Sequence, residues 1–212
     1  MSKLDYKKDL KNFYFPPTGK FSQVDVPAMN FLMIDGHGDP NTNPQFQENT
    51  EALYNIAYSI KFALKPGGAE YVIPPLEGLW WAEDMSLFGL ARKDQWDWTL
   101  MIIQPELVTS DIVEAIRREV LRKKKLAVVE QVRFERYHEG LAVQIMYLGA
   151  YADEGPTIAQ MHVYINECGY TFNGKHHEIY LGDPRRTPPE KLKTVIRQPV
   201  RKVLLLVDPS DD

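Results

Sequence analysis

The chain of 212 residues has a single cysteine, Cys168, and five histidines that show no metal-ligand spacing. One cysteine excludes a disulfide bond within the chain and suits a reducing compartment. Cys168 precedes Gly169 at the end of an expected helix, so we expect a buried core thiol and not a nucleophile. A glycine-rich phosphate loop is also missing. We therefore expect neither a metal ion nor a cofactor.

The sequence also lacks a long apolar run and an excess of positive charge. No apolar segment approaches the roughly 20 residues that cross a bilayer, and the N-terminus lacks the apolar core of a signal peptide. The net charge is −4, which argues against a dedicated nucleic-acid-binding protein. The basic run from Arg117 to Lys125 is typical of the solvated last turn of a helix, with a phosphate-binding patch as the alternative. We expect a cytoplasmic protein that binds neither nucleic acid nor membrane.

Two long segments of the chain follow the same outline. Residues 24–105 and 131–202 each read as a strand, a helix and two further strands, and each contains a Gln-Pro pair near its end. We expect an α+β fold in which duplicated β-α-β-β units form one pseudo-symmetric antiparallel sheet. Helices would cover one face, and a ligand cleft would lie on the symmetry axis. Residues 1–20 would form an N-terminal arm packed on a domain of residues 21–212.

Two helices are predicted from the spacing of apolar residues. Residues 46–65 and 157–168 both repeat apolar side chains with a period near 3.6, which is typical of amphipathic helices. Beside the core-facing stripe of the first helix lie Tyr54, Tyr58 and Phe62. These rings either widen the core-facing stripe or present the tyrosine hydroxyls to a cavity, because a buried tyrosine needs a polar partner.

The segment His176-His-Glu-Ile-Tyr-Leu181 reads as a strand with an unusual polar face. Alternation places His176, Glu178 and Tyr180 on one face, and the residues between them on the face toward the core. Glutamate is disfavoured inside strands. Either this face is exposed to water, or Glu178 lies in a cavity, where a carboxylate is suited to acid–base work or to binding a cation.

A second unusual segment is Leu76-Glu-Gly-Leu-Trp-Trp81. The neighbours Trp80 and Trp81 point to opposite faces of a strand, so at most one of them belongs to the core. Alternatively, both rings anchor the sheet, one to a helix and the other to the arm. The repeat matches Glu77 with Glu178 and brings a second acid near the axis. Aromatic walls with one or two acids suit flat, apolar or cationic ligands. The long connection 82–97 is typical of a lid or a binding element.

Several phrases of the sequence resemble the GyrI-like small-molecule-binding family. The resemblance covers residues 20–202 and implies a duplicated β-α-β-β fold with a central hydrophobic cleft. It also implies that a strand glutamate, here Glu178, binds cationic or aromatic drugs. Many members are the effector half of a transcription regulator, but residues 1–20 are too few for a helix-turn-helix domain, so we expect the stand-alone type. The phrases that carry the resemblance are Pro75–Trp81, His176–Thr187, Lys191–Val200, Gly36–Asn41 and Leu53–Tyr58.

The tryptophan-containing version of this pattern is similar to the cyclopropanoid hydrolases. These enzymes open the strained ring of yatakemycin-type DNA-alkylating antibiotics inside an aromatic cage. The resemblance implies catalytic roles for Glu178, as the general base that activates water, and for Tyr180, whose hydroxyl would donate to the carbonyl conjugated with the ring. The ligand-binding candidates are Trp80, Trp81, Tyr147, Glu77, Tyr54 and His176.

Two functions remain open from the sequence. The first is a hydrolase that detoxifies flat electrophilic xenobiotics. The second is a non-catalytic protein that sequesters hydrophobic or cationic drugs, or that inhibits a macromolecular partner as gyrase-inhibiting relatives do. The expected partner is in each case a small aromatic or cationic molecule, with inhibition of a protein as the variant. Two acids and several phenols exceed what stacking requires and favour the hydrolase.

Overall fold

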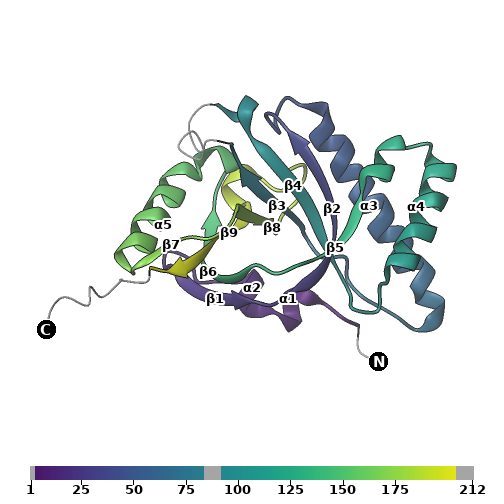
Figure 1. Cartoon of the computed structure of the whole chain (residues 1–212), viewed down its shortest axis with the longest axis horizontal. Coiled ribbons are helices and arrows are strands. Elements are labelled where there is room, and N and C mark those ends of the chain that lie inside the picture. Colours follow the sequence, from purple (N-terminus) through teal and green to yellow (C-terminus); the bar gives the residue numbers. More distant parts are fainter. Residues whose placement is uncertain (1–2, 84–91, 204–212) are drawn as a thin grey trace, which may run out of the picture.

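The computed structural model describes residues 3–83 and 92–203, and Figure 1 shows its arrangement. Part of the connection 82–97, expected to be a lid or a binding element, lies outside the described residues. The helices are α1 (Tyr6–Asp9), α2 (Lys11–Tyr14), α3 (Pro44–Leu64), α4 (Ser110–Lys124) and α5 (Gly155–Glu167). The strands are β1 (Ser22–Val26), β2 (Met29–His37), β3 (Leu76–Trp81), β4 (Asp97–Gln104), β5 (Arg133–Tyr137), β6 (Gly140–Leu148), β7 (Tyr170–Phe172), β8 (His176–Tyr180) and β9 (Lys193–Lys202).

The strands form one sheet in the order β1-β6-β9-β8-β3-β4-β2-β5, with β7 added beside β9. Neighbouring strands pair antiparallel throughout, which confirms the α+β class. The central strands β3 and β8 are flanked by β4 and β2 on one side and by β9 and β6 on the other, so the topology is symmetric. Descent of the two halves from a duplication stays a prediction.

The two Gln-Pro pairs do not correspond in the structure. Gln104 lies opposite Asn30, the second residue of β2, whereas Gln198 lies opposite Val143, the fourth residue of β6. The two Gln-Pro pairs look alike in the sequence, but they occupy different positions in the strand register.

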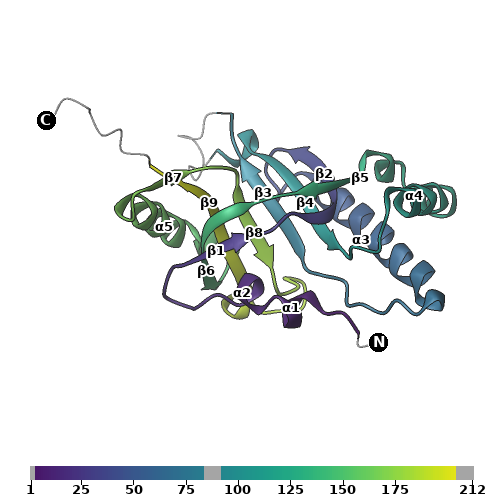
Figure 2. The same ribbon diagram turned by 60° about the horizontal axis from the view of Figure 1, so that its bottom comes forward.

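Two short connections, from β1 to β2 and from β5 to β6, join the outer edges of the sheet. β1 pairs with β6 from Ser22↔Gln144 to Val26↔Gly140, and β2 pairs with β5 from Met29↔Tyr137 to Met33↔Arg133. Only two residues separate β1 from β2, and two separate β5 from β6, so each hairpin-like connection runs from one half into the other. Figure 2 shows these strands spanning the molecule, with the short helices α1 and α2 beside them. The sheet is therefore strongly curved.

The helices α3, α4 and α5 cover one face of the sheet, which we call the helix face. α3 begins at Pro44 after Asn43, whose side chain accepts a hydrogen bond from the Gln45 amide and caps the helix. Its buried stripe packs with α4 on β2, β3 and β4, while α5 packs Met161 and Ile165 on β6 and β9. Cross-strand register shows that both areas belong to the same face. The three long helices thus lie on one face, as predicted. No helix among the described residues is long and apolar enough to cross a bilayer.

Cys168 corrects one expectation, because its side chain is exposed and not buried in the core. Met161 and Ile165 are the buried residues of α5, but the helix ends at Glu167. Gly169 then takes a positive φ of 73°. The chain therefore leaves the helix before Cys168 can continue the buried stripe.

The N-terminal segment covers the opposite face of the sheet, which we call the arm face. Phe13 and Tyr14 of α2 are buried there against apolar residues of the central strands, including Leu79 and Ile179. Side chains of this segment thus pack on the sheet, and the division into an arm of residues 1–20 and a domain of residues 21–212 stays a prediction.

A network of four buried charged groups lies under the arm. His177 Nδ1 is 2.8 Å from Glu139 Oε1, and His177 Nε2 is 3.0 Å from Glu77 Oε2. Arg197 donates to Glu139 Oε2 at 2.9 Å and to the Phe13 carbonyl at 2.7 Å. Burial opposes charge on His177, but the Glu139 carboxylate and these hydrogen bonds raise its pKa to about 9. Two acids therefore face two cations, and the arm is tied to this neutral cluster.

Replacing Arg197 with methionine should destabilise the protein by about 3–5 kcal/mol, because the Glu139 carboxylate would lose its buried guanidinium partner. The free energy of unfolding from urea titration measures this effect. Arg201→Met is the matched control, since Arg201 lies on the same strand but is exposed, and should change stability by no more than about 0.5 kcal/mol. Equal stability of the two variants would show that the network does not hold the arm.

Candidate functional site

The central pair of strands carries the candidate site on the helix face. The side chains of His176, Glu178 and Tyr180 all lie on this face, as the alternation along the strand predicted. They interact there with each other and with Trp80. Gly78 lies directly opposite Glu178, and Trp80 lies opposite His176. Because Gly78 has no side chain, the Trp80 ring and the Tyr180 hydroxyl can lie over its backbone, where a Cβ would come within 2.7 Å and 3.2 Å of them.

A chain of hydrogen bonds connects Trp80, Tyr180 and Glu178. Trp80 Nε1 donates to the Tyr180 hydroxyl at 3.0 Å, and that hydroxyl donates to Glu178 Oε2 at 2.8 Å. His176 Nε2 lies 3.3 Å from Glu178 Oε1. Burial and the charge of Glu178 hold the pKa of the Tyr180 phenol well above its usual range. Tyr180 therefore keeps its proton and donates it in a hydrogen bond to Glu178, while the Glu178 side chain remains 14% exposed and accessible to a ligand.

Aromatic rings surround this chain on the side of α3. Trp80 stacks on Phe46 with ring centres 6.1 Å apart and meets Trp96 edge-on at 5.9 Å. Trp98 completes the group at 6.5 Å from Trp80. Offset and edge-to-face arrangements at these distances are the favourable ones for aromatic pairs. The first half of the chain thus supplies an aromatic wall, in which Trp80 and Trp98 are buried in the core.

The corner before α5 closes the site on the other side. The Tyr151 ring packs edge-on against the Tyr180 ring at 5.4 Å. Glu154 follows it and is 3% exposed. Its carboxyl group is within hydrogen-bonding reach of the Glu178 carboxyl. Two carboxyl groups this close disfavour a second negative charge, so one of them is favoured to keep its proton.

Glu154 is the member of this pair that holds the proton. Burial, together with the charge of Glu178, raises the pKa of Glu154 to about 9. Its position at the start of a helix opposes this, because the helix dipole favours a negative charge by about 0.3–1 kcal/mol. That amount corresponds to less than about one pKa unit, so burial beside a second carboxylate dominates. Glu154 therefore keeps its proton at neutral pH.

Tyr54 and Tyr147 lie on the same face but at the margins of the site. Tyr54 lies beside the backbone of Leu76 at the start of β3. The Tyr147 hydroxyl donates to the Ala150 carbonyl at 3.3 Å, and Tyr147 is separated from Tyr180 by β9 in the register of the sheet. These two phenols therefore lie at the edges of the site, whereas the Tyr180 hydroxyl donates a hydrogen bond to the Glu178 carboxylate.

Glu77 and Trp81 point to the arm face and are not brought together with Glu178. Glu77 is buried between His177 and Tyr14, whose hydroxyl donates to Glu77 at 3.3 Å. The ammonium of Lys175 lies over the Trp81 ring, 3.1 Å from its centre. The register explains the difference, since Gly78 and not Glu77 faces Glu178. Of the two neighbouring tryptophans, Trp80 therefore lies on the face that carries Glu178.

Sequence reasoning missed five residues of this arrangement, one of which is Trp98. The sequence places Trp96 only in a long connection and Phe46 only in an apolar stripe. Tyr151 and Glu154 stand before Gly155-Pro156, a signal for a helix start that says nothing about burial. No sequence pattern singles out Glu154, because its environment depends on how the corner before α5 packs beside Tyr180.

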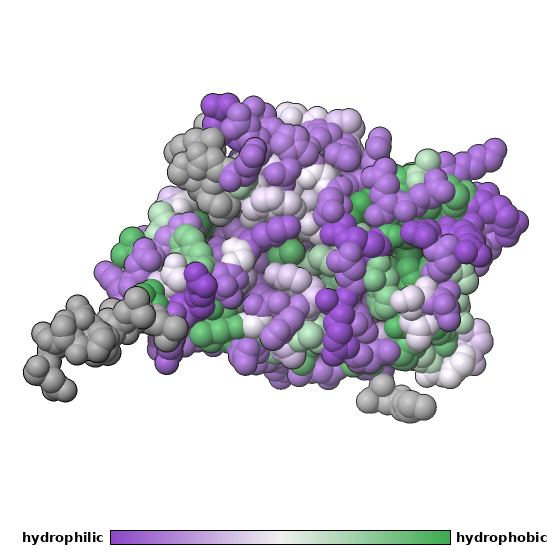
Figure 3. Space-filling view, viewed as in Figure 1, coloured by the Kyte–Doolittle hydropathy of each residue, from purple (hydrophilic) through white to green (hydrophobic). Residues whose placement is uncertain are grey.

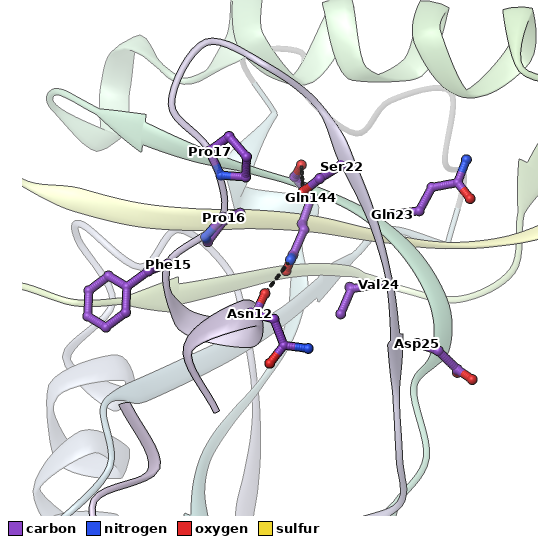
Figure 4. Close-up of a pocket in the computed structure, with 9 residues that line it drawn as sticks. All are labelled: Asn12, Phe15, Pro16, Pro17, Ser22, Gln23, Val24, Asp25 and Gln144. Atoms are coloured by element: carbon purple, nitrogen blue, oxygen red, sulfur yellow. Dashed lines mark hydrogen bonds between the residues drawn. The ribbon is translucent and has the colours of Figure 1, made fainter. Parts of the chain in front are cut away.

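A separate cavity of about 390 Å³ lies under the arm, and Figure 4 shows its lining. Gln144 Nε2 donates there to the Asn12 carbonyl at 2.7 Å. Asp25 is the only charged residue that lines this cavity, and the lining contains no cluster of acidic and aromatic side chains. We therefore place the candidate site at Glu178. Within residues 3–83 and 92–203, no group of three or more histidine, cysteine and acidic side chains could hold a metal ion. The cavity is lined by Asn12, Phe15, Pro16, Pro17, Ser22, Gln23, Val24, Asp25 and Gln144.

The outer surface gives no stronger alternative. In the space-filling view of Figure 3, hydrophilic residues cover most of the visible face, with hydrophobic patches beside α3 and α4 and near α5. Phe62 and Tyr58 of α3 are among the exposed large side chains. No convergent set of acidic and aromatic groups accompanies them among the described residues.

Comparison with known proteins identifies relatives that match nearly the whole chain. Residues 19–201 match the profile of the GyrI-like small molecule binding domain. The chain is 43% identical to an uncharacterized conserved protein from Listeria innocua, covering 94% of this chain and 100% of that one with a TM-score of 0.86. A hydrolase from Listeria innocua is 41% identical over the same shares, with a TM-score of 0.84. No curated protein matches the sequence.

A more distant structure shares the fold alone. The C-terminal domain of EcmrR is 13% identical, with a TM-score of 0.54, and the match covers 87% of this chain and 98% of that domain.

Replacing Gly78 with alanine should disturb the site, because the new Cβ would lie 2.7 Å from Trp80 Nε1 and 3.2 Å from the Tyr180 hydroxyl. We expect a loss of about 1–3 kcal/mol in the free energy of unfolding, together with a changed tryptophan emission. Gly67→Ala is the control, since the methyl group added there would meet no atom within 4 Å. Identical behaviour of both variants would mean that the Gly78 contact is not required.

Proposed function

Because the chain belongs to the GyrI-like small-molecule-binding domain family, we propose that it binds flat aromatic or cationic molecules against Trp80 and hydrolyses electrophilic ones. The observation that carries this proposal is the Glu178 carboxylate, which is held by Tyr180 and remains partly exposed beside an aromatic wall. Hydrolase is also the name of relatives that are 41% and 40% identical to this chain.

Glu178 would act as the general base of the reaction. Tyr180 and His176 hold its two oxygens from the sides, so the carboxylate is oriented before a ligand arrives. A base fixed in this way takes a proton from water as the water oxygen attacks an electrophilic carbon, which contributes about 10²–10⁴-fold in rate. The rings of Trp80 and its neighbours would hold a flat ligand in place and exclude bulk water.

The narrower proposal concerns the electrophile. A cyclopropane joined to a conjugated carbonyl is flat, apolar and opened by water, and the resemblance to cyclopropanoid hydrolases points to this class of DNA-alkylating compounds. In this proposal Tyr180 positions Glu178, because the only hydroxyl proton of Tyr180 is donated to Glu178 Oε2. Detoxification of such compounds would be the biological role.

Sequestration without catalysis is the second candidate. A carboxylate among several rings also attracts an aromatic cation through charge and cation–π contacts. Partial exposure of Glu178 favours this reading as well, because a bound cation needs direct access to the carboxylate. The two candidates differ in what the loss of the Glu178 charge does to turnover and to binding.

Glu178→Gln should reduce turnover of a spirocyclopropane dienone by about 10²–10⁴-fold, since an amide cannot accept the proton from water. Mass spectrometry of the hydrated product gives the rate, and a fluorescence titration with the ring-opened neutral product gives the affinity. We expect that affinity to stay close to that of the wild type.

Glu190→Gln is the matched control, because Glu190 is an exposed glutamate outside the site, and its turnover should equal that of the wild type. Normal turnover by Glu178→Gln would remove Glu178 from the mechanism. A wild type that binds ethidium and turns nothing over, with ethidium binding weakened in Glu178→Gln, would support sequestration instead.

A further inference from the structure

We propose that Glu154 is the general acid of the site and gives its proton to the ligand's carbonyl oxygen while Glu178 takes a proton from water. This inference rests on the proposed hydrolase function and adds a second catalytic residue to it. The site would then work with a pair of carboxyl groups that share one proton, one from β8 and one from the corner before α5.

The proton donors around Glu178 lead to this assignment. Opening a ring conjugated with a carbonyl leaves negative charge on the carbonyl oxygen, so a donor must face that oxygen. Tyr180 is the obvious candidate, but its hydroxyl proton is donated to Glu178 Oε2. Trp80 Nε1 in turn donates to the Tyr180 oxygen. Among the remaining groups, the buried Glu154 carboxyl lies near Glu178, and its Oε1 accepts no hydrogen bond from a described residue.

The local structure directs the Glu154 side chain toward the site and away from the end of α5. Glu154 occupies the position that caps α5, yet its side chain caps no backbone amide of that helix. Asn43, at the same position of α3, makes the usual capping bond. Glu154 is 3% exposed, and no described residue donates a hydrogen bond to its Oε1. A buried carboxyl oxygen without a donor is a place for a ligand group or for the acid's own proton.

The proposed step balances in atoms and charge. The water oxygen forms a bond to the ring carbon, and a proton of that water passes to Glu178. The carbon–carbon bond of the ring breaks, and its electron pair moves through the conjugated system to the carbonyl oxygen. That oxygen receives the proton of Glu154, which leaves a hydroxyl compound, a protonated Glu178 and an ionised Glu154.

Contact between the two carboxyl groups then restores the site. After the step, the proton is on Glu178 and the charge is on Glu154, the reverse of the resting state. Transfer of one proton between the neighbouring carboxyl groups returns both to the starting state without bulk water. Burial makes Glu154 the less favourable place for the charge, so the transfer proceeds in the required direction.

The groups around Glu154 predict its pH dependence. Burial and repulsion from Glu178 raise its pKa to about 9, and the nearby ammonium of Lys93 opposes this. Tyr151 and Tyr147 also face Glu154, but burial holds the pKa of Tyr151 at about 12, and that of Tyr147 is raised as well. A group with a raised pKa is a competent acid below that pKa and loses its proton above it. Activity should therefore fall as the pH rises through about 9.

The test compares pH profiles of kcat/KM for hydration of a spirocyclopropane dienone by the wild type and by Glu154→Gln. Glutamine keeps the volume and an N–H donor but transfers no proton. We expect activity at pH 7 to fall about 10²-fold or more, and the decline near pH 9 to disappear. The matched control is Asp153→Asn, because Asp153 is the exposed acidic neighbour of Glu154, and its profile should equal that of the wild type.

Two outcomes separate this inference from the proposed function. If Glu178→Gln is inactive and Glu154→Gln keeps both the wild-type rate and the decline near pH 9, the acid is another group and only this inference fails. If Glu178→Gln is fully active, the proposed function fails.

The proton can also be measured without turnover, by carbon-13 NMR titration of the glutamate carboxyl groups. We expect one carboxyl carbon that titrates near pH 9 in the wild type and is missing in Glu154→Gln. A Glu154 carboxyl that is ionised at pH 7 would overturn the inference, whatever the substrate.

Discussion

The pairing of β3 with β8 at the centre of the sheet is the constraint on which the other features depend. One register places Glu77 and His177 on the arm face and Gly78 and Glu178 on the helix face. The charges on the arm face hold β8 through Arg197 and Glu139. Because alternate residues of a strand point to opposite faces, a firm hold on His177 also fixes the direction in which Glu178 points.

Buried acidic side chains are compensated differently on the two faces of the sheet. On the arm face, two carboxylates meet a guanidinium and a histidine whose pKa is raised to about 9, so the cluster is neutral. Removing one member leaves an uncompensated charge, which is costly. On the helix face, two carboxyl groups meet without a guanidinium partner, so one of them keeps its proton. The first arrangement stabilises a fold, whereas the second is the pair to which we assign the acid and the base.

The parts predicted from the sequence are those set by local periodicity. Alternation along His176–Leu181 identified the polar face of β8, and a period near 3.6 identified α3 and α5 within about two residues at each end. Matching Glu77 with Glu178 failed, because a shift of one residue moves a side chain to the other face, and the register pairs Gly78 with Glu178. Glu154 was not predictable, since its burial arises only when the corner before α5 docks beside Tyr180.

The symmetric frame carries an asymmetric site for an electrostatic reason. The antiparallel ladder has a local two-fold axis through the pair Gly78 and Glu178, which relates Trp80 to Tyr180. A glutamate at both positions on the axis would bring two carboxylates together without any cation between them, and like charges directly opposite destabilise a sheet. Glycine in one half and glutamate in the other avoid this repulsion. The second acid comes instead from the start of α5, where burial raises its pKa to about 9, so the proton donor that we propose adds no second charge at neutral pH.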